Sequence, residues 1–493
     1  MWQYTQGFAE TNSCSMDLRS RVLSALAWTT AAKFLGQAVS WASTIVVARL
    51  LSPDDYGLMA IAMMFISVLT MVSELGLGAA LVQQKDGASE TTLRQILGLL
   101  LLVNLGLCAV FVALAPVLAG FFSDPRLASI IKILSLQFVM NSFSTIPQSL
   151  LQRELHLKRK SQVDLIALVI SSFTGLALAL LGWGVWSLVG ASLMNSLART
   201  VGLNCIGHRV LRPVFSFPGV RPYLSFGGQV TTNRVLWSLY SQSDIFVAAK
   251  LLGSELVGIY SLAMHLASFP IQKLNGIINE VAFPAFGHIQ NDTDNVASHL
   301  LKGIRVISVF AFPICWGLSS MAQELVTIVL GAKWQSAAVP LQILALIMPL
   351  LMVDNVLHTA VTGLGQVRIS LVTLLLACII MPVAFAIGCR FGLLGLSLAW
   401  LIAYPTVFLF LLRLALPIVG IRWSVFFTAM ALPALAGIFT YAAVTGAKLF
   451  ATGDDGSLVR MLVLIVVGVS AYCGMLMSTY RSGCREVWDL VRH

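Results

Sequence analysis

A segment of this chain occurs twice. Residues 30–63 match residues 231–264 without a gap, at a separation of 201 positions. A polar stripe recurs within apolar sequence, and identical residues such as Gly57 and Gly258 follow it. The stripe pairs Thr30 with Thr231, Lys33 with Arg234, Gln37 with Ser238 and Ser40 with Ser241. An internal duplication is therefore predicted, with one basic residue at the same depth in each half.

The composition of the chain indicates the environment in which these two cations lie. Hydrophobic residues make up 58% of the 493 residues and charged residues only 11%, which indicates a protein with many membrane-spanning helices. A charge in the hydrocarbon of a bilayer costs about 2.5–3.5 kcal/mol on insertion scales, so Lys33 and Arg234 are expected to face a wet or protein-lined interior. Arg binds phosphate through two parallel hydrogen bonds and Lys acts as a point charge, so the pair suits a diphosphate.

Other roles are open for the residues of the two stripes. Each cation could instead extend to the cytoplasmic headgroups from about two turns inside the membrane. Trp41 and Trp237 lie close to the stripes and could stack on sugar rings, although packing is the favoured interpretation.

Apolar runs of roughly 20 residues predict an all-α membrane protein of about fourteen helices. Four of the predicted helices span 56–81, 127–151, 223–250 and 302–330. The separation of 201 covers six predicted helices, so both halves enter the membrane in the same direction and a substrate site is expected between them. The predicted parts are a tail at 1–20, an N-lobe at 21–207, an interlobe loop at 208–222, a C-lobe at 223–416, two further helices within 417–480 and a tail at 481–493.

Basic residues in the loops predict the orientation. With the N-terminus inside, nineteen Lys and Arg residues fall on the cytoplasmic side and eight fall outside. Both termini are therefore expected in the cytoplasm, and the first helix is expected to be an uncleaved anchor. This topology accounts for the formal charge of +10 without nucleic acid binding.

Further charged residues within predicted helices extend the candidate site. Arg199 and Lys273 are candidates for substrate binding, although both lie near the cytoplasmic ends of their helices and could reach the headgroups. Glu74 and Asp244 are the most deeply placed carboxylates. They are candidates for binding a coupling proton or sodium ion, with pairing to the cations as the alternative.

The sequence lacks the motifs of covalent chemistry. It contains no P-loop, no glycine-rich dinucleotide fingerprint, no metal-binding spacing of Cys and His, and no nucleophile elbow. Eight cysteines, most of them within apolar runs, imply neither a disulfide nor a metal site. The chain is predicted not to be an enzyme and to use no cofactor.

Five strings carry a resemblance to a known family, in this order along the chain. They read ARLLSPDDYGLMAIA at 48–62, SELGLGAALVQ at 73–83, LSFGGQVTTNRVLWSLYSQSDIFVAAKLLGSELVGIYSLA at 224–263, NEVAFPAFGHIQND at 279–292 and GAKWQSAAVPLQILAL at 331–346. Over residues 20 to 420 or so, the chain resembles the Wzx-type flippases, the polysaccharide transporter branch of the multidrug/oligosaccharidyl-lipid/polysaccharide exporter superfamily. Within that branch it is most similar to the colanic-acid and exopolysaccharide translocases.

The resemblance implies an inner-membrane flippase that moves an undecaprenyl-diphosphate-linked oligosaccharide from the cytoplasmic to the periplasmic leaflet. The product would enter exopolysaccharide, capsule or O-antigen synthesis. Alternating access between two lobes is implied, with a polymerase and a chain-length regulator of the same pathway as partners. The cavity cations of the family match Lys33 and Arg234. The alternative is an ion-coupled multidrug or small-molecule exporter of the same superfamily, against which two buried cations argue.

Overall fold

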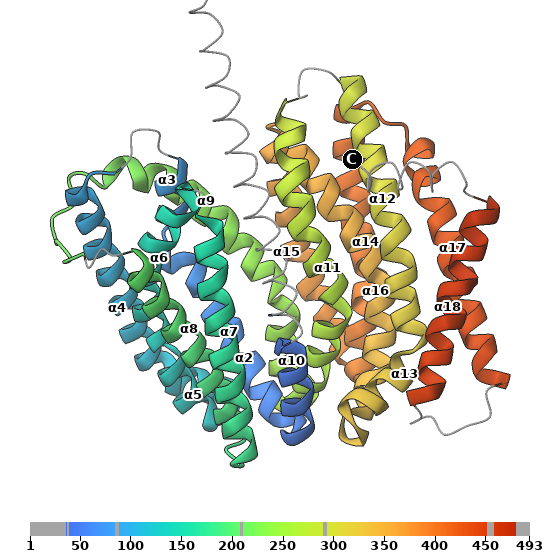
Figure 1. Ribbon diagram of the computed structural model, residues 1–493, viewed down its shortest axis with the longest axis horizontal. Helices are drawn as coiled ribbons and strands as arrows, with labels where there is room; N and C mark the ends of the chain where they lie inside the picture. The colour runs from blue at the N-terminus through green and yellow to red at the C-terminus, as the bar shows by residue number, and fades with distance from the viewer. Residues whose placement is uncertain are drawn as a thin grey trace, which may run out of the picture. The chain divides into compact units, whose positions relative to one another are not determined.

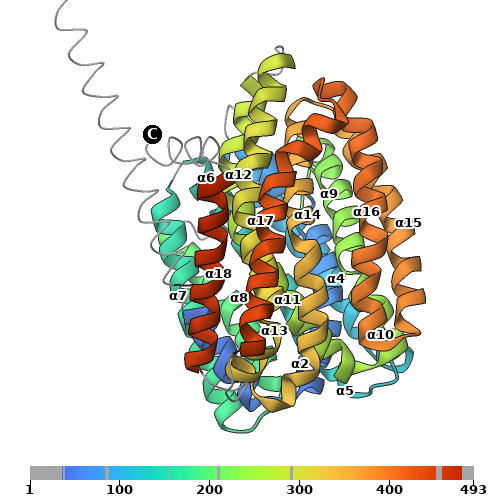
Figure 2. The same cartoon turned by 90° about the vertical axis from the view of Figure 1, so that its right-hand side faces the viewer.

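A computed structural model describes residues 36, 39–83, 88–154, 156–207, 211–288, 293–450 and 458–479. Within these ranges the chain is helical and has no strand (Figures 1 and 2). The helices are Val39–Leu50, α2 (Pro53–Ser73), α3 (Leu77–Gln83), α4 (Glu90–Phe121), α5 (Arg126–Leu134), α6 (Leu136–Arg153), α7 (Leu157–Leu180), α8 (Val185–Gly207), α9 (Arg221–Ser241), α10 (Ser243–Leu252), α11 (Ser254–His288), α12 (Thr293–Ser320), α13 (Ala322–Leu325), η1 (Val326–Leu330), η2 (Ala332–Ala337), α14 (Ala338–Gly363), α15 (Val367–Cys389), α16 (Gly392–Val419), α17 (Trp423–Phe450) and α18 (Leu458–Thr479).

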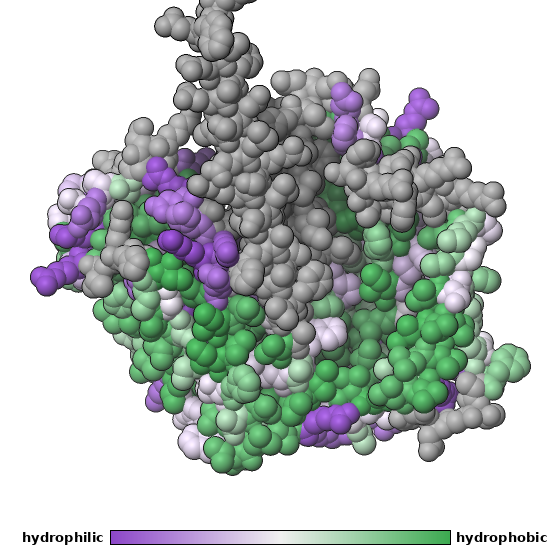
Figure 3. Space-filling view, viewed as in Figure 1, coloured by the Kyte–Doolittle hydropathy of each residue, from purple (hydrophilic) through white to green (hydrophobic). Residues whose placement is uncertain are grey.

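The helices have the length and surface of a membrane protein. Ten of those described are long and apolar enough to cross a bilayer. Large hydrophobic side chains such as Phe173, Ile379 and Ile402 are about two-thirds exposed, and hydrophobic residues predominate over the lower part of the face seen in Figure 3. Lipid is the solvent in which such a surface is stable. The all-α polytopic fold is confirmed, whereas the number of fourteen crossings stays a prediction.

Four helices predicted as single runs are divided in the structure, and the first of them, at 56–81, is divided into α2 and α3. The run at 127–151 is divided into α5 and α6, the run at 223–250 into α9 and α10, and the run at 302–330 into α12, α13 and η1. The division at 127–151 falls in apolar sequence, whereas that at 223–250 falls in the polar run at 241–244 and that at 302–330 follows Ser319 and Ser320. The prediction of one unbroken helix is wrong at 56–81, 223–250 and 302–330, whereas Arg126–Arg153 still forms a single candidate membrane span, because Ser135 keeps a right-handed helical backbone.

The chain forms two compact units, residues 1–52 with 62–238, and residues 53–61 with 239–493. In the first unit α6 packs against α3, α4 and α8, and α7 runs along α8. One of its hydrophobic clusters gathers Leu77, Ile96 and Ile146 with Tyr223 at the start of α9. This cluster fixes α3, α4 and α6 around the beginning of α9. The division into lobes at 21–207 and 223–416 stays a prediction.

In the second unit α14 packs against α11, α12 and α16. The two C-terminal helices, α17 and α18, pack on α12, where the Tyr472 hydroxyl donates to the Val309 carbonyl oxygen at 2.7 Å. Lys448 at the end of α17 donates to Glu324 at 2.6 Å, and the carboxyl side chain is almost fully buried. The C-terminal pair is therefore an integral part of this unit.

The duplication is visible in the second unit as one backbone contact made twice. A Cβ added at Gly57 would lie 1.7 Å from the Ser254 carbonyl oxygen, and one added at Gly258 would lie 1.8 Å from the Pro53 carbonyl oxygen. In the alignment of the two segments Gly57 corresponds to Gly258, and Pro53 corresponds to Ser254. The glycine of each copy therefore touches the same backbone position in the other copy. Reciprocal contacts of this kind are the property of a two-fold arrangement.

We expect Gly57→Ala to destabilise the protein, because a methyl group cannot fit against the Ser254 backbone. Overpacking of this kind costs about 1–3 kcal/mol. Gly106→Ala in α4 is the matched control, since a Cβ there meets nothing within 4 Å. Thermal unfolding of the purified proteins measures the difference, and equal unfolding midpoints for the two variants would contradict the contact.

Candidate functional site

A break between α2 and α3 lies at the centre of the candidate site. The helix predicted at 56–81 ends at Ser73, and Leu75 and Gly76 adopt φ of 48° and 63° before α3 begins. The Asn104 amide of α4 donates to the Ser73 carbonyl oxygen at 3.2 Å, which satisfies one of the groups freed at the helix end. The prediction of a continuous helix is wrong here, and the break leaves Glu74 outside both helices.

Helix α9 crosses this break with its backbone in contact. A Cβ added at Gly227 would lie 2.3 Å from the Leu75 carbonyl oxygen, and one added at Gly76 would lie 2.3 Å from the Gly227 carbonyl oxygen. Only glycine permits such an approach, and the positive φ of Gly76 favours glycine independently. The contact fixes the position of α9 relative to Glu74.

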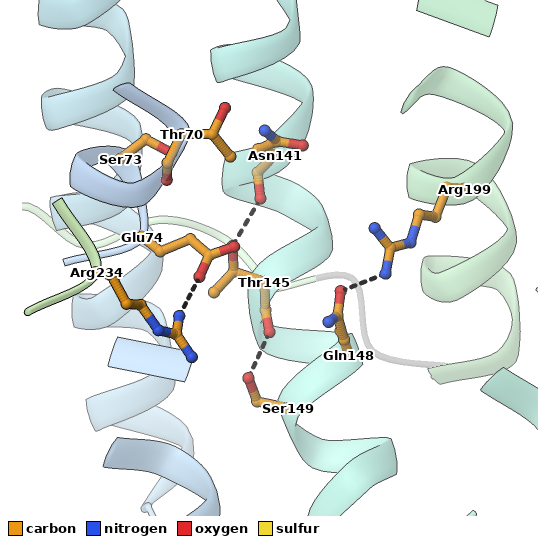
Figure 4. Close-up of polar contacts among 9 residues, drawn as sticks. All are labelled: Thr70, Ser73, Glu74, Asn141, Thr145, Gln148, Ser149, Arg199 and Arg234. Carbon is orange, nitrogen blue, oxygen red and sulfur yellow. Dashed lines mark hydrogen bonds and ion pairs between the residues drawn. The ribbon is translucent and has the colours of Figure 1, made fainter. Parts of the chain in front are cut away.

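Arg234 follows Gly227 by seven residues, about two helical turns, so both lie on the same face of α9. Its guanidinium Nη1 donates to Glu74 Oε2 at 3.1 Å (Figure 4). The two side chains are 45% and 37% exposed. An ion pair as open as this contributes at most about 1 kcal/mol, so a stronger anion can displace the carboxylate.

The ion pair lies in the wall of a cavity of about 930 Å³ within the first unit. Helix α9 contributes Arg234 and Trp237, the break and α3 contribute Glu74 and Gln83, and α6 forms the remaining polar wall. The residues of α6 that line the cavity are Thr145, Gln148, Ser149 and Gln152. Arg234 and Glu74 are the two charged residues of the lining, and the others are neutral.

The polar face of α6 is a part of the site that was not predicted from the sequence. Asn141, Thr145, Gln148, Ser149 and Gln152 recur at helical spacing inside a span predicted as a membrane helix. This helical period could have predicted a polar face on the helix. Uncharged amides and hydroxyls are a weaker indication of a site than cations are, because they cost less free energy in a membrane. Two of the hydroxyls bond their own helix, Thr145 to the Asn141 carbonyl oxygen at 2.9 Å and Ser149 to the Thr145 carbonyl oxygen at 2.8 Å (Figure 4).

Arg199 of α8 lies behind this wall rather than in the cavity lining. Its guanidinium donates to Gln148 Oε1 at 3.1 Å, as Figure 4 shows. It also forms an ion pair with Asp164 of α7 at 3.0 Å. Lys160 pairs with the same Asp164 carboxylate at 3.4 Å. Arg199 therefore contacts the cavity wall through Gln148, and it has a carboxylate partner within the protein.

The remaining predicted site residues are distributed more widely. Thr231 has a buried hydroxyl oxygen without a hydrogen-bond partner, Ser238 is buried, and Ser40 and Ser241 are half-buried. Lys273 lies in α11, and its side chain is outside what the structure describes. Thr30, Lys33 and Gln37 are outside the described residues. Of the predicted charged residues, the structure thus brings together Arg234 and Glu74.

Asp244 lies in a separate buried network in the second unit. The Tyr260 hydroxyl donates to its carboxylate at 2.8 Å, and the Ile245 backbone N–H donates at 2.7 Å. The Trp400 indole donates in turn to the Tyr260 hydroxyl at 2.8 Å. Only 3% of Asp244 is exposed, so its hydrogen-bond donors replace water around the carboxylate.

A second, partly buried carboxylate lies close to this network. Asp354 accepts a hydrogen bond from the Tyr404 hydroxyl, and its side chain is 3.7 Å from that of His358. Tyr404 lies beside Trp400, with the ring centres 5.9 Å apart. The second unit therefore contains two carboxylates joined through aromatic side chains, a grouping that the sequence did not indicate.

Comparisons with known proteins agree on one family. The family model described as "Polysaccharide biosynthesis protein" matches residues 46–339. The lipopolysaccharide biosynthesis protein WzxC of Escherichia coli K12 is 28% identical over 78% of this chain and 79% of its own length. The succinoglycan biosynthesis transport protein ExoT of Rhizobium meliloti 1021 is 27% identical over 91% of both chains. The teichuronic acid biosynthesis protein TuaB of Bacillus subtilis 168 is 24% identical over 83% of this chain and 86% of its own.

Solved structures share the fold. The lipid II flippase MurJ in an inward closed conformation gives a TM-score of 0.73 at 15% identity, over 92% of this chain and 98% of its own. An inward-facing multidrug resistance transporter of the MATE family gives 0.58 at 15% identity, over 85% of this chain and 96% of its own. At these identities the likeness concerns the fold alone.

We expect Gly227→Ala to lower the unfolding temperature, because its Cβ would clash with the Leu75 carbonyl oxygen. The adjacent Gly228→Ala is the control, since a Cβ there meets nothing within 4 Å and alanine favours a helix. Differential scanning fluorimetry of the two purified variants compares them. If Gly227→Ala is as stable as Gly228→Ala, α9 does not touch the break.

Proposed function

The chain belongs to the polysaccharide biosynthesis protein family, and on this premise we propose that it is a flippase for lipid-linked oligosaccharides. It moves an undecaprenyl-diphosphate-linked repeat unit from the cytoplasmic to the periplasmic leaflet. The relatives named for lipopolysaccharide, succinoglycan and teichuronic acid biosynthesis support this proposal, as does the fold shared with a lipid II flippase. Flipping is movement without covalent chemistry, so the family requires no catalytic motif.

The observation that carries the proposal is the half-exposed Arg234 in a cavity between apolar helices. A permanent charge among membrane helices is costly unless it serves a polar pathway. Guanidinium binds phosphate oxygens through paired, charge-assisted hydrogen bonds, which are stronger than its single bond to Glu74. A diphosphate headgroup is therefore a better partner for Arg234 than the carboxylate.

Lys33 completes the proposed diphosphate site, because the duplication relates it to Arg234. Lys273 is retained as a secondary cation, and Arg199 as a residue that positions Gln148. In the proposed cycle the headgroup enters from the cytoplasm and the polyprenyl tail remains in lipid. Lobes at 21–207 and 223–416 then rock to release the headgroup outside.

We further propose the inner membrane as the location, with both termini in the cytoplasm. The polymerase and the chain-length regulator of the same pathway are the proposed protein partners. These proposals rest on the asymmetry of basic loop residues and on the biosynthetic roles named for the relatives.

The multidrug alternative rests on the MATE fold and on Glu74, a carboxylate in the cavity wall that could attract a cationic drug. Neutralising each partner of the ion pair separates the two functions. A diphosphate site needs Arg234, whereas a cation site needs Glu74.

We expect Arg234→Gln to weaken binding of undecaprenyl diphosphate to the purified protein in nanodiscs. Loss of hydrogen bonds from a charged group predicts a change of about tenfold to a hundredfold. Glu74→Gln should keep or increase this affinity, because it frees the guanidinium from its competitor. A merely structural ion pair would give similar losses in both variants, and binding in Arg234→Gln equal to the unsubstituted protein would refute the site.

The same two variants, examined in cells, test transport. Arg234→Gln, and likewise Lys33→Glu, should accumulate lipid-linked oligosaccharide in the cytoplasmic leaflet and abolish polymer export, while the protein still inserts in the membrane. Normal export from both variants would contradict the assignment of these cations.

Asp244 is our proposed site for a coupling proton or sodium ion, and Glu74 is the second candidate. A carboxylate enclosed by Tyr260 and Trp400 can change its charge only with a change in its packing, which is the requirement for coupling. Asp244→Asn should remove the dependence of flipping on an ion gradient in proteoliposomes while leaving diphosphate binding intact. Glu324→Gln, another buried carboxylate in the same unit, is the control and should retain that dependence. Gradient-dependent flipping by Asp244→Asn would exclude Asp244.

A further inference from the structure

We propose that the cavity in the first unit contains a sugar-binding subsite between Trp237 of α9 and the amide face of α6. The subsite would hold the neutral sugar next to the diphosphate, and this inference rests on the proposed function. Its components are an exposed indole, two glutamine amides of α6 and the adjoining Gln83 of α3.

Trp237 differs from the buried tryptophans of the protein. Its side chain is 58% exposed and lines the cavity, and it makes no ring contact with another aromatic residue of the described structure. Trp316 and Trp400, in contrast, donate their indole N–H groups to internal oxygens and pack against neighbouring rings. An indole left open within a cavity presents an apolar face and an N–H donor, which suit the C–H face and the hydroxyls of a pyranose.

The position of Trp237 relates it to the phosphate site. It follows Arg234 by three residues on α9, a spacing at which helical side chains are neighbours. In a lipid-linked oligosaccharide the first sugar is bonded directly to the diphosphate. A diphosphate on Arg234 therefore brings its first sugar within reach of the indole.

The opposite wall supplies hydrogen-bonding groups of both kinds. Gln148 and Gln152 are four residues apart and lie on one face of α6. Gln148 Oε1 accepts a hydrogen bond of 3.1 Å from Arg199. The amide NH₂ group of Gln148 therefore remains to donate into the cavity. Gln152 and Gln83 make no hydrogen bond within the described structure, so each offers a donor and an acceptor. Amides of this kind match adjacent sugar hydroxyls.

The charges of the lining define the class of sugar. Apart from Arg234 and Glu74 the cavity wall is neutral, consisting of amides, hydroxyls and small or apolar side chains. The cavity has a volume of about 930 Å³, which is at the upper end of the roughly 300–1,000 Å³ of small-molecule sites. A neutral hexose or N-acetylhexosamine is therefore the expected first sugar.

The test compares two probes on the purified full-length protein in nanodiscs. One probe is a short-chain polyprenyl diphosphate, and the other is the same lipid bearing one N-acetylhexosamine on the diphosphate. We expect the protein to bind the glycosylated probe more tightly. Trp237→Ala should weaken the binding of the glycosylated probe by about tenfold, the effect of losing a stacked aromatic contact. It should leave the affinity for the bare diphosphate unchanged. Trp237→Phe should restore most of the difference.

Two further variants keep the test independent of folding effects. Gln152→Ala should weaken the binding of the glycosylated probe by about two- to tenfold, the value of one neutral hydrogen bond. It should not change the affinity for the bare diphosphate. Trp183→Ala is the matched control, because Trp183 is also 58% exposed but lies in the turn after α7, outside the cavity. It should bind both probes normally.

The outcomes separate the two levels of the proposal. Equal affinity of the unsubstituted protein for both probes would overturn the sugar subsite and leave the diphosphate site standing. Equal weakening of both probes by Trp237→Ala would also overturn it, because the indole would then act on the phosphate site or on folding. Failure of the unsubstituted protein to bind either probe would overturn the proposed function itself.

Discussion

The contact between the backbones of Gly227 and the Leu75–Gly76 break determines the geometry of the first unit. Two helices that touch through glycine leave no room for side chains at the crossing, and the side chains on either side must then converge. Arg234, two turns along α9, meets the Glu74 carboxylate at 3.1 Å as a result. The interruption of α2 also frees Glu74 from a regular helix, so a local loss of backbone hydrogen bonding creates a polar position within apolar surroundings.

This arrangement gives Arg234 a partner of intermediate strength. A buried, fully paired arginine would be locked, and an arginine in contact with lipid would be too costly. A half-exposed pair beside a cavity avoids both extremes, because the carboxylate neutralises the guanidinium and still yields to a doubly charged ligand. The second unit uses the opposite solution for Asp244, which is enclosed by fixed donors from Tyr260 and the backbone. The Arg234–Glu74 pair of the first unit is thus accessible from the cavity, whereas Asp244 of the second unit is enclosed by the protein.

The sequence was sufficient to predict the class of fold, because hydropathy and helical period are properties of each helix separately. It also predicted the duplication and selected Arg234 and Glu74, since a charge within an apolar run is conspicuous. The break at Glu74 could not be predicted, because it depends on the approach of Gly227 from a helix that is remote in sequence. The α6 amides were missed for a related reason. A glutamine on a membrane helix has meaning only when the structure shows what it faces.

The paired contact of Gly57 with Ser254 and of Gly258 with Pro53 has a consequence for the ancestry of the chain. A surface that is complementary to a copy of itself is what holds a symmetric dimer together. A half-length ancestor with this glycine could have assembled as two identical subunits before its gene was duplicated and fused. Fusion removes the requirement that the two copies stay identical, and the stripe now carries lysine at position 33 and arginine at position 234.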